Sequence, residues 1–289
     1  MTMPVMDPAL TAAYDTCRRM HRRHDPTYYW ATRRLPPDVR PATHALYGYV
    51  RTADQLVDGP RRPPTPEARR AALDAWEAEL RRGLRDGGSP NPVVGALVDA
   101  AGRHDLPLGE LATYMRSMRV DCGPVRISSW EELCGYMDGS AGSVGRIMAP
   151  LLGVAERHHA DYGRLGLAFQ HANFVRDVRE DWRLDRIYLP EEDRQRFGVA
   201  EQDFGRASAT PELRALIAHE VARARRLFAA AAPAVAAAPA RVRPGVRLAC
   251  AVYESVLDRV EATGHDVLGR RMGVRFGRLP LLAWGALRP

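Results

Sequence analysis

Apolar residues recur at intervals of three and four along most of the chain, which is the spacing of amphipathic helices. The first such stripe follows Asp7 and runs through Leu10, Tyr14 and Cys17 to about His24. The same spacing predicts further helices at residues 42–58, 66–80, 92–98, 108–118, 129–151, 211–228 and 246–260, and a central helix within the stretch 166–190. No run of alternating β-branched residues is flanked by hairpin signals. The pattern therefore predicts an all-α fold.

Several of these helices begin with the same local signal, a capping residue followed by proline. This pair occurs at Asp7-Pro8, Thr65-Pro66, Asn91-Pro92 and Thr210-Pro211. Ser129 and Glu132 have the spacing of a capping box. Breaks are expected at 59–67, at 85–92, in an irregular stretch after Pro190, and at 232–245. None separates two self-sufficient halves and no solenoid repeat is visible, so we predict a single domain over residues 1–289.

The central stretch carries a polar stripe on an otherwise apolar helix. Gln170, Asn173, Asp177 and Asp181 are spaced three, four and four residues apart, so their side chains share one helix face. The residues between them are mostly apolar, which indicates burial of the helix. Two buried carboxylates one turn apart repel each other and lose hydration, so a cation is expected between them.

A second stripe of the same kind lies in the predicted helix 42–58, where Tyr47, Arg51, Asp54 and Asp58 are spaced four, three and four residues apart. If the two helices face each other in a bundle, four carboxylates converge on one space, as in sites for divalent cations with oxygen ligands such as Mg²⁺. The neighbouring arginines 51 and 176 suit bidentate binding of phosphate oxygens. Aspartate pairs also occur on solvated faces and in ion pairs, and periodicity alone leaves both interpretations open.

Composition adds limits on partner and compartment. The formal charge is +7 and the pI about 9.6, which suits an anionic partner. All 42 basic residues are arginines, scattered in pairs rather than gathered in one run, so nucleic acid is not the expected partner.

The four cysteines have no zinc or disulfide spacing, which favours free thiols in a reducing cytoplasm. No apolar run has the length of a signal peptide or a bilayer span. We expect a cytoplasmic protein that is soluble or at most peripheral to a membrane.

The two stripes and their surroundings resemble the squalene and phytoene synthase family, the head-to-head prenyl synthases. YGYVRTADQLVDGP (47–60) is similar to the family's first aspartate motif, and LGLAFQHANFVRDVREDWRLDRIYLP (165–190) is similar to its second. The likeness extends from the segment 24–28 to VYESVLDRVEATGHDVLGRR near the C-terminus. Within the family, the sequence of the first motif and of the N-terminal part is most similar to bacterial phytoene synthases.

The resemblance implies a helical bundle around a central cavity and prenyl diphosphate substrates. Carried over by position, it makes Asp54, Asp58, Asp177 and Asp181 ligands of Mg²⁺, assisted by Asn173. Contacts to the substrates' diphosphates or to the reacting carbons would come from His24, Thr27, Tyr47, Arg51, Gln170, Arg176, Tyr188, Tyr253 and Arg270. The catalytic residues would then be the four aspartates with Arg51 and Tyr136.

Small residues recur at Gly139, Gly142 and Gly145 in the predicted helix 129–151. A glycine inside a helix costs about 1 kcal/mol relative to alanine, so a specific reason is expected. Close helix packing and a kinked wall of the reaction site beside Tyr136 are both consistent with the pattern. The segment is similar to a wall motif of the family, but Arg146 stands where phytoene synthases are expected to have an apolar residue. It is more like relatives that make presqualene diphosphate or hydroxysqualene.

The function expected from this resemblance is Mg²⁺-dependent condensation of two geranylgeranyl diphosphates to phytoene through a cyclopropyl diphosphate. The alternatives are condensation of two farnesyl diphosphates to presqualene diphosphate or, with NADPH, to squalene, and a terpene cyclase on the same scaffold. An alternative of a different class is a non-catalytic helical protein that binds anionic membranes. We expect a monomer or weak dimer, and leave open a peripheral membrane contact for product release.

Overall fold

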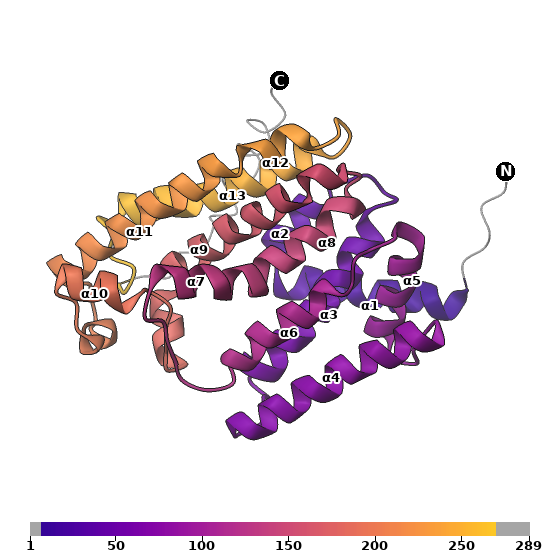
Figure 1. Cartoon of the computed structure of the whole chain (residues 1–289), viewed down its shortest axis with the longest axis horizontal. Helices are drawn as coiled ribbons and strands as arrows, with labels where there is room; N and C mark the ends of the chain where they lie inside the picture. Colours follow the sequence, from indigo (N-terminus) through magenta and orange to yellow (C-terminus); the bar gives the residue numbers. More distant parts are fainter. Residues whose placement is uncertain (1–6, 270–289) are drawn as a thin grey trace.

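The computed structural model describes residues 7–269, except for the side chain of Thr27, and is mainly helical (Figure 1). The long helices are α1 (Pro8–His24), α3 (Arg40–Asp58), α4 (Pro66–Asp86), α5 (Pro92–His104), α6 (Glu110–Val120), α9 (His159–Arg183), α11 (Pro211–Ala230) and α13 (Arg243–Ala262). Shorter helices are α2 (Pro26–Thr32), α7 (Trp130–Met137), α8 (Ser143–Leu151), α10 (Glu191–Phe197) and α12 (Ala232–Ala237), with 3₁₀ turns at Glu156–His158 and Glu201–Gly205. The predicted all-α fold is confirmed.

The helix starts follow the capping signals in the sequence. The side chains of Asp7, Thr65, Asn91 and Thr210 each accept a hydrogen bond from a backbone N–H in the first turn of α1, α4, α5 and α11. Ser129 caps α7 in the same way, through the N–H of Glu132. The Glu132 carboxylate accepts from the N–H of Ser128, one residue before the cap. Only half of the expected capping box is therefore formed.

Three helices arise where the sequence pattern predicted none, and one of them, α12, lies in the expected break at 232–245. α2 begins at Asp25-Pro26, the same capping pair that starts the long helices, and the Asp25 carboxylate accepts from the N–H of Tyr28. α10 occupies the stretch after Pro190 that was expected to be irregular. The three helices have six or seven residues each, too few for a periodic pattern to stand out.

A short parallel bridge joins β1 (Val125–Arg126) to β2 (Arg186–Ile187), and it too was absent from the prediction. It ties the segment after α6 to the segment that follows α9. Two residues per strand leave no alternation to detect.

The segment predicted as one helix at 129–151 is interrupted by a π-helical turn, η1 (Asp138–Gly142), between α7 and α8. A Cβ on Gly139 would lie 2.0 Å from the Ser117 hydroxyl of α6, and one on Gly145 would lie 2.2 Å from the Tyr162 carbonyl of α9. Across the same contact, a Cβ on Gly166 would lie 2.4 Å from the Ala141 carbonyl. The glycines thus permit close approach of three helices, and π turns of this kind are frequent at functional sites.

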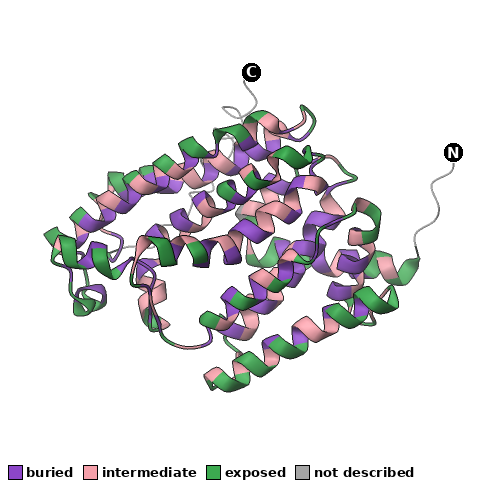
Figure 2. Cartoon of the chain, in the orientation of Figure 1, coloured by how far each residue is buried: buried purple, intermediate pink, exposed green. Residues whose placement is uncertain are grey.

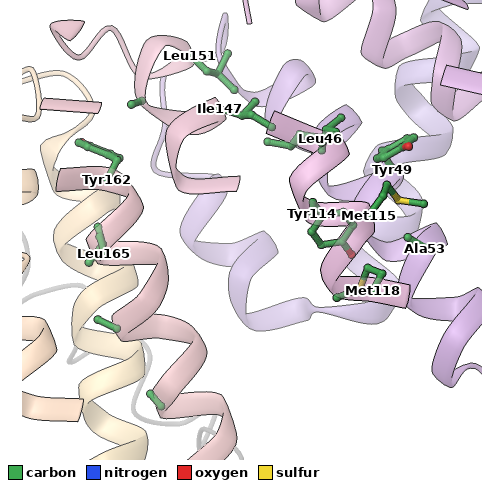
Figure 3. Close-up of a cluster of buried hydrophobic side chains, with 14 of the residues drawn as sticks. Leu46, Tyr49, Ala53, Tyr114, Met115, Met118, Ile147, Leu151, Tyr162 and Leu165 are labelled. Carbon is green, nitrogen blue, oxygen red and sulfur yellow. The ribbon is translucent and has the colours of Figure 1, made fainter. Parts of the chain in front are cut away.

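The helix with the second aspartate stripe, α9, lies at the centre of the bundle and packs against α8, α11 and α13 (Figure 1). Buried residues line the facing sides of the helices, whereas α4 at the periphery is largely exposed (Figure 2). One hydrophobic cluster extends from Ala13 to Leu268. Figure 3 shows part of it, with α3 and α6 joined through Leu46, Tyr49, Ala53, Tyr114, Met115 and Met118. This packing fixes α3, which carries the first stripe.

Candidate active site

The two predicted stripes meet in the folded chain. Asp54 and Asp58 of α3 and Asp177 and Asp181 of α9 all line one cavity of about 280 Å³, which we call the polar cavity. The i, i+4 spacing places each pair on one face of its helix, and the packing of α3 and α9 in the bundle turns both faces towards the same space.

The polar cavity has a strong excess of negative charge. Among the residues that the structure describes, its lining contains five aspartates, the fifth being Asp121, and one arginine, Arg186. Arg186 donates to Asp58 at 2.5 Å, and Arg51 lies 3.8 Å from Asp54. Outside the lining, the Arg176 guanidinium makes a bidentate pair with Asp177, with its shorter N–O distance 2.5 Å. The carboxylates exceed the guanidinium groups, so the lining suits added cations.

The charge excess is also visible in the acidity of the carboxyl groups. Burial raises the pKa of Asp54 to about 6, against the lowering effects of Arg51 and of a hydrogen bond from Tyr114. Burial and the neighbouring Asp177 raise the pKa of Asp181 well above its usual range. Oxygen ligands whose charge is poorly compensated are the kind that hard divalent cations take. The residues present therefore fit Mg²⁺.

A second cavity of about 310 Å³, the apolar cavity, adjoins the first. Val50, Asp54, Ser140, Gln170 and Asn173 line both spaces. The rest of its wall is mainly apolar and comes chiefly from α2, α8, α9 and α13, for example Ala31, Val144, Met148, Phe169 and Val246. The polar cavity with its aspartates therefore lies at the end of the apolar cavity, and this arrangement suits a substrate with an anionic head and an apolar tail.

The remaining predicted site residues fall in three groups. Lining the apolar cavity are Tyr47, whose ring stacks on His21 at 3.9 Å, and Tyr253, whose ring stacks on Phe169 at 4.4 Å. Lining the polar cavity are Tyr136 and Tyr188, while Gln170 and Asn173 border both. Outside both linings are Arg51, Arg176 and the exposed His24. The Thr27 side chain and Arg270 lie outside the described residues.

Among the lining residues of the polar cavity that were not predicted from the sequence, Tyr114, Asp121 and Arg186 make hydrogen bonds there. Tyr114 of α6 donates to Asp54 at 2.9 Å. Asp121, at the C-terminal cap of α6, and Arg186 in β2 come from connecting segments without helical periodicity. Tyr114 was hidden for another reason, because it occupies an apolar position of its helix. For Arg186 the sequence offered one signal, its position two residues before Tyr188, which was predicted to lie in the site.

Arg146 does not shape either cavity. Its guanidinium pairs with Asp138 at 2.7 Å and with Glu110 at 2.9 Å, and the residue is absent from both linings. The arginine at this position, where an apolar residue was expected, therefore forms ion pairs that join α8 to η1 and α6. It gives no reason to favour one product over another.

A second group of metal-ligand type, Asp193, His219 and Glu220, lies between α10 and α11. Arg223 donates to Asp193 at 2.6 Å and to Glu220 at 2.8 Å, and covers the Trp130 ring at 4.3 Å. The guanidinium already supplies the positive charge these carboxylates need. We interpret the group as a buried ion network.

Comparison with known proteins agrees with this geometry. The family model described as squalene/phytoene synthase matches residues 21–280. The chain belongs to the squalene/phytoene synthase family. A phytoene synthase of Thermus thermophilus is 33% identical over 264 residues, which cover 91% of this chain and 89% of the relative. A 15-cis-phytoene synthase of Synechococcus elongatus is 32% identical over 276 residues, covering 91% and 88%.

Solved structures show the same fold. A dehydrosqualene synthase superposes with a TM-score of 0.88 over 96% of both chains, at 24% identity. A squalene synthase from Alicyclobacillus acidocaldarius has a TM-score of 0.80 at 29% identity and covers 90% of this chain and 97% of its own. As a member of the squalene/phytoene synthase family, the chain is a prenyltransferase acting on prenyl diphosphates. Between residues 7 and 269, none of its helices combines the length and apolarity of a membrane span.

Proposed function

We propose that this enzyme condenses two geranylgeranyl diphosphates head to head to give phytoene, through a cyclopropyl diphosphate. The observation that carries the proposal is the pair of facing aspartate stripes at the end of an apolar cavity. The choice of phytoene is supported by relatives named phytoene synthase in bacteria, cyanobacteria and plants, which are 31–33% identical over at least 90% of this chain.

Asp54, Asp58, Asp177 and Asp181, with the Asn173 amide, would hold Mg²⁺. When bound, the metal supplies positive charge that stabilises the diphosphate as it leaves. The carboxylate excess and the raised pKa values of Asp54 and Asp181 support this assignment.

The chain's own residues would bind and orient the substrates. Arg51 and Arg176 stand beside the aspartates, where a guanidinium can bind diphosphate oxygens in bidentate fashion. Gln170 and Asn173, at the junction of the two cavities, can bind the oxygens nearest the reacting carbon. The apolar wall excludes water, which would otherwise quench a carbocation.

Purified protein incubated with Mg²⁺ and either geranylgeranyl or farnesyl diphosphate, with and without NADPH, tests the proposal. We expect geranylgeranyl diphosphate to be consumed and phytoene to form without NADPH. Presqualene diphosphate from farnesyl diphosphate, or squalene when NADPH is present, would identify the alternative substrate. A cyclic product from one substrate would identify a terpene cyclase, and failure to consume either diphosphate would refute the proposal.

A peripheral membrane contact is a further part of the proposal. The exposed arginines 22, 23, 33 and 34 flank α2, and α2 residues Tyr28, Ala31 and Thr32 form part of the apolar cavity wall. An anionic surface at this face would receive an apolar product where it leaves the enzyme. We expect sedimentation with phosphatidylglycerol vesicles but not with phosphatidylcholine vesicles, and weaker sedimentation of the Arg33→Glu, Arg34→Glu double variant.

A further inference from the structure

Asp121 forms the centre of a buried hydrogen-bond network beside the predicted metal ligands. The residue is 5% exposed and lines the polar cavity. Its Oδ2 accepts from the Tyr136 hydroxyl at 2.5 Å, and its Oδ1 accepts from the Tyr188 hydroxyl at 2.7 Å. Its backbone carbonyl accepts from Arg186, which also donates to Asp58. One carboxylate therefore fixes two phenols and is linked to the first aspartate stripe.

This arrangement fixes the role of each phenol oxygen. A phenol has one proton to donate, and both protons are committed to Asp121. What each oxygen can offer to another group is therefore a lone pair. Tyr136 and Tyr188 both line the polar cavity, and their rings pack with Phe174 at centroid distances of 6.0 Å and 4.1 Å. The cavity wall thus combines aromatic faces with two oriented phenol oxygens.

A carboxylate is a costly way to hold two hydroxyl groups in a buried place, since an ion must be desolvated there. Burial raises the pKa of Asp121 to about 6, although both phenols and Arg186 favour its charged form. A strong acceptor kept near the point of protonation can take up a proton during a reaction. The hydrogen-bond geometry shows through which groups that proton would arrive.

The proposed reaction supplies such a proton. Two diphosphates leave as anions and neither an oxidant nor a reductant is consumed, so charge balance requires two protons to leave carbon for each phytoene formed. In each case a C–H bond breaks, its electron pair forms a new carbon–carbon bond, and a base takes the proton.

We propose that Asp121 is a positioning residue for this proton loss, acting through the phenols of Tyr136 and Tyr188. The phenol oxygen removes the proton from the carbocation while the phenol's own proton moves to the Asp121 carboxylate. After each of the two losses the proton passes from Asp121 to the diphosphate that has just left or to water, which restores the carboxylate before it acts again. This inference rests on the proposed function, because only the condensation supplies a carbocation next to these phenols.

The test uses Asp121→Asn, which keeps the size of the side chain but cannot accept both phenol protons or a transferred one. With geranylgeranyl diphosphate deuterated at C1, the carbon that loses hydrogen, we expect kcat to fall roughly 10²-fold or more. We expect KM to change less than about threefold and the primary deuterium isotope effect on product formation to increase. Asp121→Glu, which retains a carboxylate, should recover part of the rate. In a Tyr136→Phe, Tyr188→Phe background, Asp121→Asn should cause little additional loss.

The matched control is Asp138→Asn, an acidic residue in the neighbouring π turn whose partner is Arg146 and which does not line either cavity. Its kcat and isotope effect should equal those of the wild type. The inference is overturned if Asp121→Asn behaves like this control, or if it loses activity with an unchanged isotope effect and a lowered melting temperature. If the Asp121→Asn variant does not fold, Asp121→Glu replaces it. The inference is then overturned if Asp121→Glu lowers kcat by the same factor in the Tyr136→Phe, Tyr188→Phe background as in the wild type. A wild-type enzyme inactive on geranylgeranyl diphosphate would instead refute the proposed function.

Discussion

The residues around the polar cavity that bear the same side chain, the aspartates, have different neighbours. Asp177 is paired with Arg176, whereas Asp58 is paired with Arg186 from a distant segment. Within residues 7–269, Asp54 has a long contact to Arg51 and a hydrogen bond from Tyr114. At the scale of single residues, the neighbours therefore decide how closely a guanidinium group compensates each carboxylate.

Asp177→Asn should lower kcat by roughly 10²- to 10³-fold, because a neutral amide cannot provide the charge that holds Mg²⁺. The Mg²⁺ concentration for half-maximal activity should rise as well. Steady-state assays over a Mg²⁺ titration measure both quantities. Asp258→Asn, on the exposed side of α13, is the control and should leave both unchanged. Normal Mg²⁺ dependence in the Asp177 variant would argue against its role as a ligand.

The raised pKa of Asp54 predicts how stability depends on pH without metal. Because its pKa of about 6 in the folded state exceeds the usual value near 4, the protonated carboxyl stabilises the fold below about pH 4. This contribution is lost as the pH rises through about 6. Asp54→Asn imitates the protonated form, so it should melt at a higher temperature than the wild type at pH 7.5 and at a similar one at pH 4.5. Thermal melts in EDTA measure the difference, and a lower melting temperature for the variant at pH 7.5 would contradict the prediction.

At the scale of elements, the close contact of α9 with η1 and α8 depends on glycine. The backbones approach where Gly145 faces the Tyr162 carbonyl and Gly166 faces the Ala141 carbonyl. Ala141, Gly145 and Gly166 also line the apolar cavity, so the contact sets the position of its wall. Close packing, one of the two explanations for the repeated small residues, is confirmed at this contact, and the role of the segment as a wall of the reaction site stays a prediction.

Gly145→Ala should destabilise the protein by about 1–3 kcal/mol through overpacking, since backbone rather than a flexible side chain must move. The melting temperature should fall by roughly 2–10 °C. Gly102→Ala is the matched control, because Gly102 is exposed in α5 with nothing within 4 Å of an added Cβ. Alanine there should be neutral or slightly stabilising by helix propensity. Equal melting temperatures for the two variants would show that α8 and α9 can separate without cost.

At the scale of the whole molecule, substrate length depends on how far the apolar cavity extends between α2, α8, α9 and α13. Residues from positions 25 to 253 contribute to its wall. No single motif encodes this depth, because each wall position comes from a different helix. The accepted prenyl chain is consequently a property of the assembled bundle.

Filling the apolar cavity should change the preferred substrate. Ala249 of α13 lines this cavity. Ala249→Phe should reduce kcat/KM for geranylgeranyl diphosphate at least tenfold relative to farnesyl diphosphate. The size of the effect follows from about 0.8 kcal/mol of binding free energy for each methylene of the longer chain that the cavity no longer buries. Ala262→Phe, exposed at the end of the same helix, should leave the ratio unchanged. The measurement is a competition assay with both substrates, and a constant ratio in the Ala249 variant would place the tail elsewhere.

Much of the local structure was readable from the sequence. The capping pairs predicted where α1, α4, α5 and α11 begin, and periodicity predicted most long helices to within a few residues, although α9 starts at His159 rather than near Gly166. The missed elements were α2, α10, α12 and the two-residue bridge, which are too short to show a period. Only α2 had an available signal, the Asp25-Pro26 pair.

The sequence by itself determined the two polar stripes, because the spacing of Asp54 with Asp58 and of Asp177 with Asp181 depends only on the geometry of one helix. The tertiary structure decided that the stripes face one another across a single cavity, because packing in the bundle orients both helices. It also brought Asp121 and Arg186 to that cavity from connecting segments. Their partners are distant in the chain, and no local physical rule links Asp121 to Tyr188 or Arg186 to Asp58 before the chain has folded.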